Sequence, residues 1–205
     1  MPFPAVIDLS HYAWSGIAKP DLVAAREVGV VAVIYKATEG STYKDPRYAE
    51  TRALAKSAGL LWGAFHFGTA APVDAQIANF FATAEPDDDT LMCLDFERNG
   101  PTAANTMGGA AAIDFMTKAS ARLNRDLVIY TGSHMAEAFG AGAVPALAKY
   151  RLWWAEYGVA APKLHATWAH AWLWQYTQAG KVGTIDPCDC STYAGDLADL
   201  KVGWT

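Results

Sequence analysis

The 205-residue amino-acid sequence predicts an α/β fold, a single irregular TIM-like β/α barrel. Strand-like and helix-like runs alternate along the chain, which favours parallel strands because a crossover helix returns the chain to the same edge of a sheet. Eight runs are strand-like and the helices are clear only in the first five units, so we expect a closed barrel whose last third is irregular. An open, doubly wound sheet is the alternative fold that this alternation allows.

The first five units follow from apolar spacing and from turn residues. Residues 30–37 are dense in β-branched side chains, which is typical of a buried strand. The helix expected at 46–58 stops at Gly59, and Pro20 stands just before the helix expected at 21–28. The other strands expected in these units are 5–9, 60–67, 90–96 and 127–131, and the other helices are 72–84 and 105–123.

Beyond Ser133 the predicted elements become short. We expect a helical piece at 143–149, followed by strands at 151–155, 171–176 and 181–185. No linker, repeat or low-complexity segment interrupts the chain, so residues 1–205 are expected to form one domain.

Charge and composition exclude several kinds of partner. The net charge of -5 and the lack of a basic run argue against nucleic acid and against an anionic membrane. No apolar run approaches the roughly 20 residues of a spanning helix, and the N-terminus shows no secretory signal, so we expect synthesis in the cytoplasm without a membrane anchor. Cys93, Cys188 and Cys190 are expected to be free thiols, since their number is odd and their spacing does not suit zinc.

Acidic residues gather at or just beyond the ends of the predicted strands. In a parallel barrel the carboxyl ends of the strands share one rim, where catalytic residues collect, so these side chains should converge on one mouth. Stability alone rarely favours such an accumulation of like charge. The residues are Asp8, Glu39, Asp95, Glu97, Asp186 and Asp189.

The sharpest local feature is the segment Leu94-Asp95-Phe96-Glu97. Successive strand side chains alternate between faces, so Asp95 and Glu97 point the same way. Two neighbouring carboxyls disfavour double ionisation, and glycoside hydrolysis needs one protonated and one ionised acid. A strand end with two solvated acids is the simpler alternative reading of this spacing.

Aromatic and histidine residues admit both structural and functional readings. The eight Trp, nine Tyr and eight Phe exceed what this length usually holds, and those not in the core would suit a cleft that stacks on sugar rings. A metal held by His11, His66 and the acids is conceivable, but no paired-histidine spacing supports it, so we expect no metal and no cofactor. The chain also lacks a Gly-x-Ser-x-Gly elbow and a phosphate-binding glycine loop.

These segments, taken together, resemble glycoside hydrolase family 25, the muramidase-type lysozymes. Each match is weak alone, but seven occur in family order across nearly the whole chain. They are Ile7-Asp8-Leu9-Ser10-His11-Tyr12, Tyr35-Lys36-Ala37-Thr38-Glu39-Gly40, Gly63-Ala64-Phe65-His66-Phe67, Leu94-Asp95-Phe96-Glu97, Ile129-Tyr130-Thr131, Leu152-Trp153-Trp154-Ala155-Glu156-Tyr157 and Trp174-Gln175-Tyr176-Thr177.

The resemblance implies a flattened barrel with five regular βα units and three further strands. It also implies hydrolysis, with retention, of the β-1,4 bond between N-acetylmuramic acid and N-acetylglucosamine in peptidoglycan. Carried over by position, Glu97 would be the general acid/base, Asp95 the second catalytic carboxylate and Asp8 a cleft carboxylate that orients the pair. The substrate-binding residues expected with them are Asp189, Glu39, Lys36, Tyr35, Phe65, Phe67, Tyr130, Trp153, Tyr157 and Gln175.

The C-terminal element departs from the family pattern. Ser191 stands where the family usually has Asn, two cysteines flank Asp189, and Asp186 competes for the role of C-terminal acid. A catalytically silent glycan-binding module of the same fold is therefore the alternative function, and an enzyme acting on another amino-sugar polymer such as chitin is a further one. Asp95 could attack the sugar directly or orient the substrate's own N-acetyl group.

The setting in which the protein works is also an expectation. We expect a monomer that reaches the cell wall through a holin-type membrane pore, as a phage endolysin would, or through a dedicated secretion machine, as an effector would.

Overall fold

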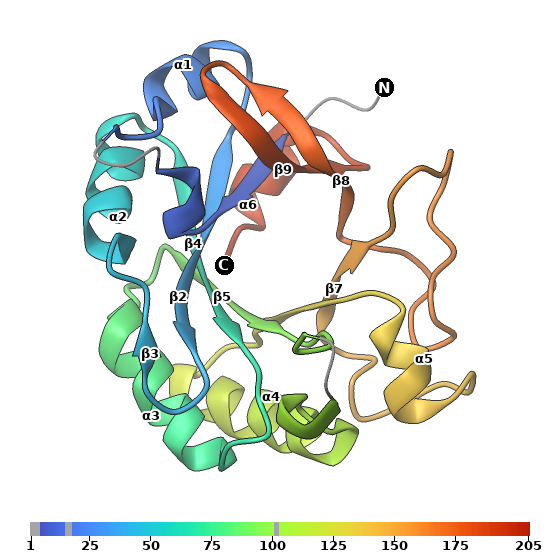
Figure 1. Ribbon diagram of the computed structural model, residues 1–205. Helices are drawn as coiled ribbons and strands as arrows, with labels where there is room; N and C mark the ends of the chain where they lie inside the picture. Colours follow the sequence, from blue (N-terminus) through green and yellow to red (C-terminus); the bar gives the residue numbers. More distant parts are fainter. Residues whose placement is uncertain (1–4, 15–17, 101–102) are drawn as a thin grey trace.

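The protein forms a closed barrel in the computed structural model, which describes residues 5–14, 18–100 and 103–205 (Figure 1). Strand β1 (Val6–Leu9) pairs with β2 (Ala32–Glu39) on one side and with β9 (Ile185–Tyr193) on the other, which closes the ring. The ring continues from β2 through β4 (Leu61–Phe67), β5 (Thr90–Asp95), β6 (Val128–Thr131), β7 (Arg151–Ala155) and β8 (Leu173–Val182).

The first seven ring strands run parallel and the last one does not. Strand β9 is antiparallel to both of its neighbours, β8 and β1. The prediction of a strand at 181–185 is wrong. The chain turns there, with Gly183 at a φ of 57°, and the eighth strand of the ring, β9, follows this turn. A short strand, β3 (Tyr43–Lys44), also folds back on the end of β2.

Five helices lie outside the ring of strands (Figure 1). Each follows a parallel strand, so the five βα units expected from the sequence are confirmed. The helices are α1 (Leu22–Glu27), α2 (Tyr48–Ser57), α3 (Val73–Ala84), α4 (Gly109–Leu123) and α5 (His134–Phe139), with short 3-10 turns η1 (His11–Ala13) and η2 (Ala103–Asn105).

The helix expected at 143–149 is wrong, because this segment forms turns. The fifth helix is α5 instead, which begins after Ser133 and ends at Gly140, whose φ of 76° stops it. None of the helices in the described parts of the chain is both long and apolar enough to cross a membrane.

Two apolar layers hold the barrel together. One lies between the strands and the surrounding helices, and the other fills the interior of the barrel. The interior layer includes Leu200 of α6 (Leu197–Val202) and Trp204, whose indole Nε1 donates to the carbonyl of Trp62 at 2.8 Å. Since Trp62 lies at the start of β4, the C-terminal segment covers the amino ends of the strands and leaves their carboxyl ends open.

Candidate active site

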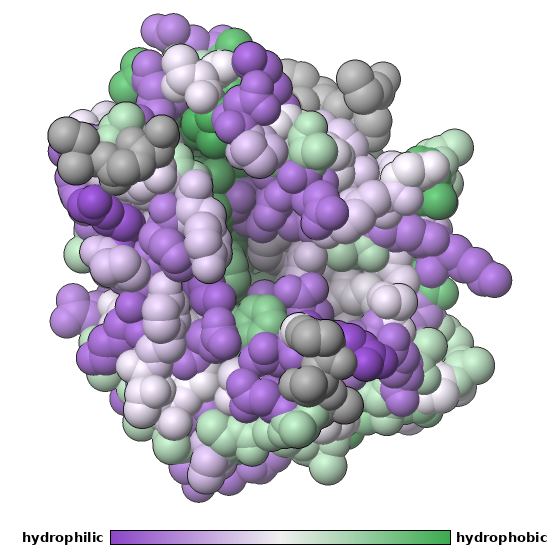
Figure 2. All heavy atoms as spheres, in the orientation of Figure 1, coloured by the Kyte–Doolittle hydropathy of each residue, from purple (hydrophilic) through white to green (hydrophobic). Residues whose placement is uncertain are grey.

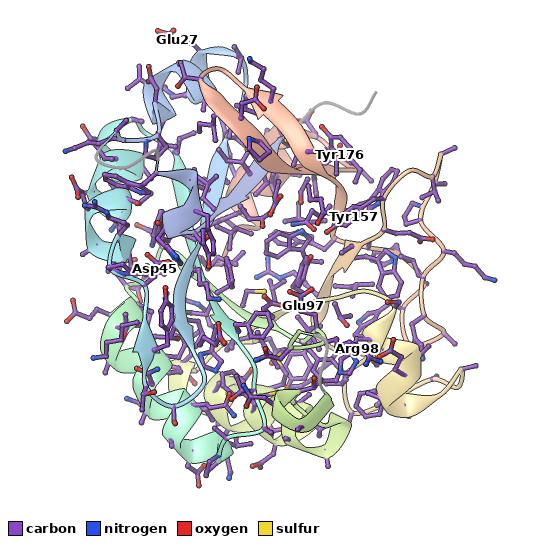
Figure 3. All side chains as sticks on the ribbon, in the orientation of Figure 1. Glu27, Asp45, Glu97, Arg98, Tyr157 and Tyr176 are labelled. Atoms are coloured by element: carbon purple, nitrogen blue, oxygen red, sulfur yellow. The ribbon has the colours of Figure 1, made fainter. Side chains whose placement is uncertain are left out.

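Strand alternation brings the predicted acids to the open end of the barrel. Asp8 and Asp95 are inward-facing residues near the ends of β1 and β5, and Glu97 follows two residues after Asp95. These three acids and Asp189 line one cavity of about 230 Å³. Figure 3 shows Glu97 near the middle of the view, with Tyr157 above it.

Asp95 is a buried carboxyl with an unused acceptor. Its side-chain oxygen Oδ1 is buried and has no hydrogen-bond partner among the described residues. Burial raises the pKa of Asp95 well above its usual value, the neighbouring Glu97 raises it further, and the Lys36 ammonium opposes both. A buried acceptor left without a donor costs stability, and a ligand's N–H or O–H group can supply the donor.

Glu97 lines two adjoining cavities. It lines the cavity that holds Asp95 and also a larger adjoining cavity of about 880 Å³. Burial raises the pKa of Glu97 above its usual value, Asp189 adds to this, and Lys36 and His134 act in the opposite direction. Glu97 therefore keeps its proton to higher pH than an exposed glutamate does, while remaining open to the cavity.

Asp8 belongs to a hydrogen-bonded network that crosses the barrel mouth. Gln175 of β8 donates from Nε2 to Asp8 Oδ2 at 2.8 Å. The Oε1 atom of Gln175 accepts hydrogen bonds from the hydroxyls of Tyr130 at 2.8 Å and Tyr157 at 2.5 Å. The amide orientation of Gln175 is thereby fixed, because its oxygen meets two hydroxyl donors and its nitrogen meets a carboxylate.

Asp189 lies opposite Asp8 in the pairing of β9 with β1. Burial raises the pKa of Asp8 well above its usual value and Asp189 raises it further, while burial raises the pKa of Asp189 to about 6. Asp186, the competing acid, is an exposed residue whose carboxylate pairs with Lys181 at 3.1 Å. The structure thus places Asp189 in the cavity with the other acids, and Asp186 only on the rim of a neighbouring one.

Lys36 is the cation that faces this acidic cluster. Its ammonium forms an ion pair with Glu39 at 2.7 Å and lies 4.8 Å from the centroid of the Phe67 ring. Lys36 lines the same cavity as Asp95 and Glu97, whereas Glu39, which was expected to bind substrate, does not line it and only pairs with Lys36. The positive charge favours an ionised carboxylate beside it without removing the effect of burial.

Aromatic side chains form the walls around the acids. Phe65 and Phe67 alternate inward on β4, and Tyr130 and Trp153 come from β6 and β7. Trp153 donates from Nε1 to Ser191 Oγ at 2.9 Å, so the serine that departs from the family pattern fixes this indole. Such walls supply the flat apolar faces that pyranose rings bind.

Two further cavities adjoin the central one on opposite sides, and we call the three together the groove; Figure 2 shows a hollow near the middle of this face. The largest shares Glu97 and Tyr130 with the central one. A third, of about 570 Å³, shares Asp8, Tyr12 and Asp189 with the central one on the other side. The central acids therefore lie in the middle of an extended groove, which suits a polymer better than a small molecule.

Tyr35 requires a correction, because it does not reach the groove. It is fully buried on the opposite face of β2 from Lys36, as strand alternation demands. Its ring packs on Trp62 at 5.9 Å between centroids, and its hydroxyl donates to Asp45 at 3.4 Å. The hypothesis that Tyr35 binds substrate is therefore dropped.

The two histidines considered as metal ligands lie elsewhere. His66 is fully buried between Thr38 and Gln76, and burial lowers its pKa to about 4. His11 binds Asp45 through Nδ1 at 2.9 Å. Within the described ranges, no cluster of three histidine, cysteine or acidic residues has the geometry to hold a metal ion.

Sequence reasoning missed several residues that line the groove. Ser10 and Tyr12 border the central cavity, and His134 and Glu156 border the largest one. Ser10 and Tyr12 could have been found from the first matched segment, because they stand two and four residues after Asp8. His134 was missed with its helix, since the sequence beyond Ser133 was expected to be non-helical up to residue 143.

The site and the fold define a class of protein: a barrel glycosidase whose open groove is centred on paired carboxyls. The family model of glycosyl hydrolases family 25 matches residues 7–185. This chain belongs to glycosyl hydrolase family 25, and it is a glycoside hydrolase of the lysozyme, or muramidase, type.

Individual relatives agree with this assignment. Lysozyme M1 of Streptomyces globisporus is 33% identical over 95% of this chain and 69% of its own length. An autolytic lysozyme of Clostridium acetobutylicum is 31% identical over 84% of this chain, which spans about half (51%) of that protein. The bacterial lysozyme of Streptomyces coelicolor matches the structure with a TM-score of 0.84 at 29% identity, covering 96% of this chain and 94% of that one.

Proposed function

We propose that residues 1–205 act as one catalytic domain that hydrolyses the β-1,4 bond between N-acetylmuramic acid and N-acetylglucosamine, with retention at the anomeric carbon. Hydrolysis of peptidoglycan in general follows from the family. The observation that carries the finer proposal is the Asp95–Glu97 pair, two neighbouring carboxyls with raised pKa values in the middle of an extended groove.

Glu97 is assigned the role of general acid and then general base. It reaches both the central and the largest cavity, so a glycosidic oxygen bound between them lies within its reach. Its raised pKa supplies the proton for the leaving oxygen. After departure of that oxygen, the resulting carboxylate accepts a proton from the attacking water, which is the second half of a retaining reaction.

Asp95 is assigned the role of second catalytic carboxylate. It is the last residue of β5, it is buried, and its Oδ1 has no donor among the described residues. Charge developing at the anomeric carbon would be stabilised by an ionised Asp95, and Lys36 favours that ionised form. The same free oxygen suits either direct attack on the sugar or orientation of the substrate's acetamido group.

Digestion of purified peptidoglycan tests the proposed bond and stereochemistry. Mass spectrometry of the products is expected to find fragments that end in reducing N-acetylmuramic acid. Proton NMR during the first minutes is expected to show the β-anomer before mutarotation. Fragments that end in reducing N-acetylglucosamine would contradict the bond assignment, and an initial α-anomer would contradict retention. Binding of muropeptides without any new reducing end would favour the catalytically silent module.

We also propose that the protein folds in a reducing compartment and reaches the wall through a membrane pore or a secretion machine. Support comes from the three cysteines, which are buried free thiols. If the thiols need no oxidation, the same digestion proceeds at an unchanged rate in excess reductant. A loss of activity under reduction would contradict this proposal.

A further inference from the structure

The groove extends beyond the catalytic acids into a cavity that the proposed reaction does not use. This cavity of about 570 Å³ lies between η1 and the turn that joins β8 to β9. Asp8, Phe65 and Asp189 line both this cavity and the central one, whereas Lys19 and Asp186 line this one and not the central one. Its walls therefore carry charged groups of both signs besides the acids that it shares with the central cavity.

Tyr12 stands where this cavity meets the central one. It lines both cavities, and it is 85% exposed, although it is a large aromatic residue. An exposed ring in a groove has little packing value for the fold, but it offers a flat apolar face to a ligand. Tyr12 is thus placed to contact any chain that runs from the central cavity into the second one.

The Tyr12 ring lies against the ring of its chain neighbour, His11. The His11 ring lies 4.0 Å from the Tyr12 ring between centroids. Asp45 Oδ2 accepts from the backbone N–H of His11 at 3.0 Å and binds its ring Nδ1 at 2.9 Å. The Tyr43 hydroxyl approaches the same Nδ1 at 3.1 Å.

Asp45 is itself held in place by the fold. Its side chain is fully buried, and its Oδ1 accepts from the backbone N–H of Arg47 at 2.9 Å and from the Tyr35 hydroxyl at 3.4 Å. Figure 3 shows Asp45 well away from the central opening that holds Glu97. Among the described residues, His11 joins Asp45 to Tyr12, and we name the two residues the Asp45–His11 clamp.

We infer that Tyr12 is the stacking platform of an additional sugar-binding subsite, in which the second cavity holds a further N-acetylhexosamine unit of the glycan strand. The Asp45–His11 clamp positions this platform. The inference rests on the proposed function, because it assigns to the same groove a longer glycan than bond cleavage alone requires. Tyr12 is a binding residue here, and His11 and Asp45 are positioning residues.

Steady-state kinetics on two soluble glycan fragments that differ by one disaccharide test the inference. The parent enzyme is expected to have the lower KM for the longer fragment. Tyr12→Ala should raise that KM about fivefold to tenfold and leave kcat within about twofold, because an aromatic contact is lost away from the reacting bond. Tyr12→Phe keeps the ring and should restore the parent KM, and Val202→Ala, at a highly exposed position on α6, is the matched control.

Positioning is tested with Asp45→Asn, for which the measured quantity is the ratio of kcat/KM between the two fragments. A clamp role lowers this ratio in folded protein, whereas a purely structural defect lowers activity on both fragments equally. An unchanged KM for the longer fragment in Tyr12→Ala would overturn the subsite. If the parent enzyme cleaved neither fragment, the proposed function would fail instead, and calorimetric binding of the longer fragment to parent and Tyr12→Ala protein would then decide the subsite.

Discussion

At the scale of single residues, the barrel mouth concentrates acids that the fold keeps partly protonated. Asp8 and Asp189 face each other across adjacent strands, and Asp95 and Glu97 share the same cavity. Burial is the main cause of the raised pKa in all four, and repulsion from a neighbouring acid adds to it in Asp8, Asp95 and Glu97, whereas a hydrogen bond with Asp8 lowers the pKa of Asp189. Acid chemistry near neutral pH needs this arrangement, but the charge repulsion opposes folding.

The raised pKa of Asp189 makes the unfolding free energy depend on pH. The pKa of Asp189 is about 6 in the folded protein, whereas that of an unfolded aspartate is about 3.9. The folded protein therefore binds this proton more tightly than the unfolded chain does. The stabilisation is complete below about pH 4 and is lost as pH rises through about 6. Urea denaturation should therefore show the unfolding free energy of the parent falling relative to Asp189→Asn between pH 4 and 7.

Asp186→Asn is the matched control for this titration. Asp186 lies on the same strand, but it is exposed and paired with Lys181. Its substitution should leave the pH profile of stability close to that of the parent. A difference between parent and Asp189→Asn that stays constant from pH 4 to 7 would contradict the assignment of a raised pKa to Asp189.

At the scale of elements, the antiparallel hairpin of β8 and β9 completes the ring and carries Asp189. Gly180 of β8 pairs with Cys188 of β9, and a Cβ at this position would meet Cys190 Sγ at 2.5 Å and the Cys188 carbonyl oxygen at 2.9 Å. A carbonyl oxygen cannot move without moving its strand. The backbone of β9, and with it Asp189, therefore depends on the absence of a side chain at Gly180.

Gly180→Ala is expected to lower the unfolding free energy by about 1 to 3 kcal/mol, the usual cost of overpacking. It should also reduce the rate of wall digestion, because β9 must shift. Thermal or urea denaturation and a turbidity assay measure the two effects. Gly142→Ala, where an added Cβ meets nothing within 4 Å, should change stability by less than about 0.5 kcal/mol. Equal effects of the two substitutions would refute the steric explanation.

The elements that could be predicted are those with strong local signals. The β-branched run that became β2 and the helix that stops before Gly59 follow from local preference and apolar spacing. Strand β9 was missed because its sequence, with Pro187 and Asp186, is typical of a loop, and pairing with β1 and β8 makes it a strand. Tertiary pairing of this kind leaves no local pattern.

The site residues also divide into those that a local pattern predicts and those that only the folded barrel brings together. Asp95 and Glu97 line the same cavity, as strand alternation predicted, although β5 ends at Asp95 and Glu97 lies two residues beyond it. The same rule would have shown that Tyr35 and Lys36 lie on opposite faces of β2. The bond from Gln175 to Asp8 spans 167 positions of the chain, so only the closed ring brings these residues together. The Asp45–His11 clamp likewise joins segments 34 positions apart, and no sequence motif predicts it.

At the scale of the whole molecule, one end of the barrel is closed and the other is a groove. The C-terminal segment covers the amino ends of the strands, and three joined cavities cross the carboxyl ends. The acids lie in the middle of this groove, so the protein can bind a strand on both sides of the bond that it cuts. We propose that Glu97 supplies the proton for this cut.

The most direct test compares initial rates of reducing-end release from purified peptidoglycan by the parent, Glu97→Gln and Glu27→Gln. Glutamine keeps the size of Glu97 but cannot donate the proton, so the rate should fall by about 100-fold or more. Glu27 is exposed on α1 at the edge of the molecule (Figure 3), and its substitution should leave the rate unchanged. Folded Glu97→Gln protein that releases reducing ends at the parent rate would contradict the account.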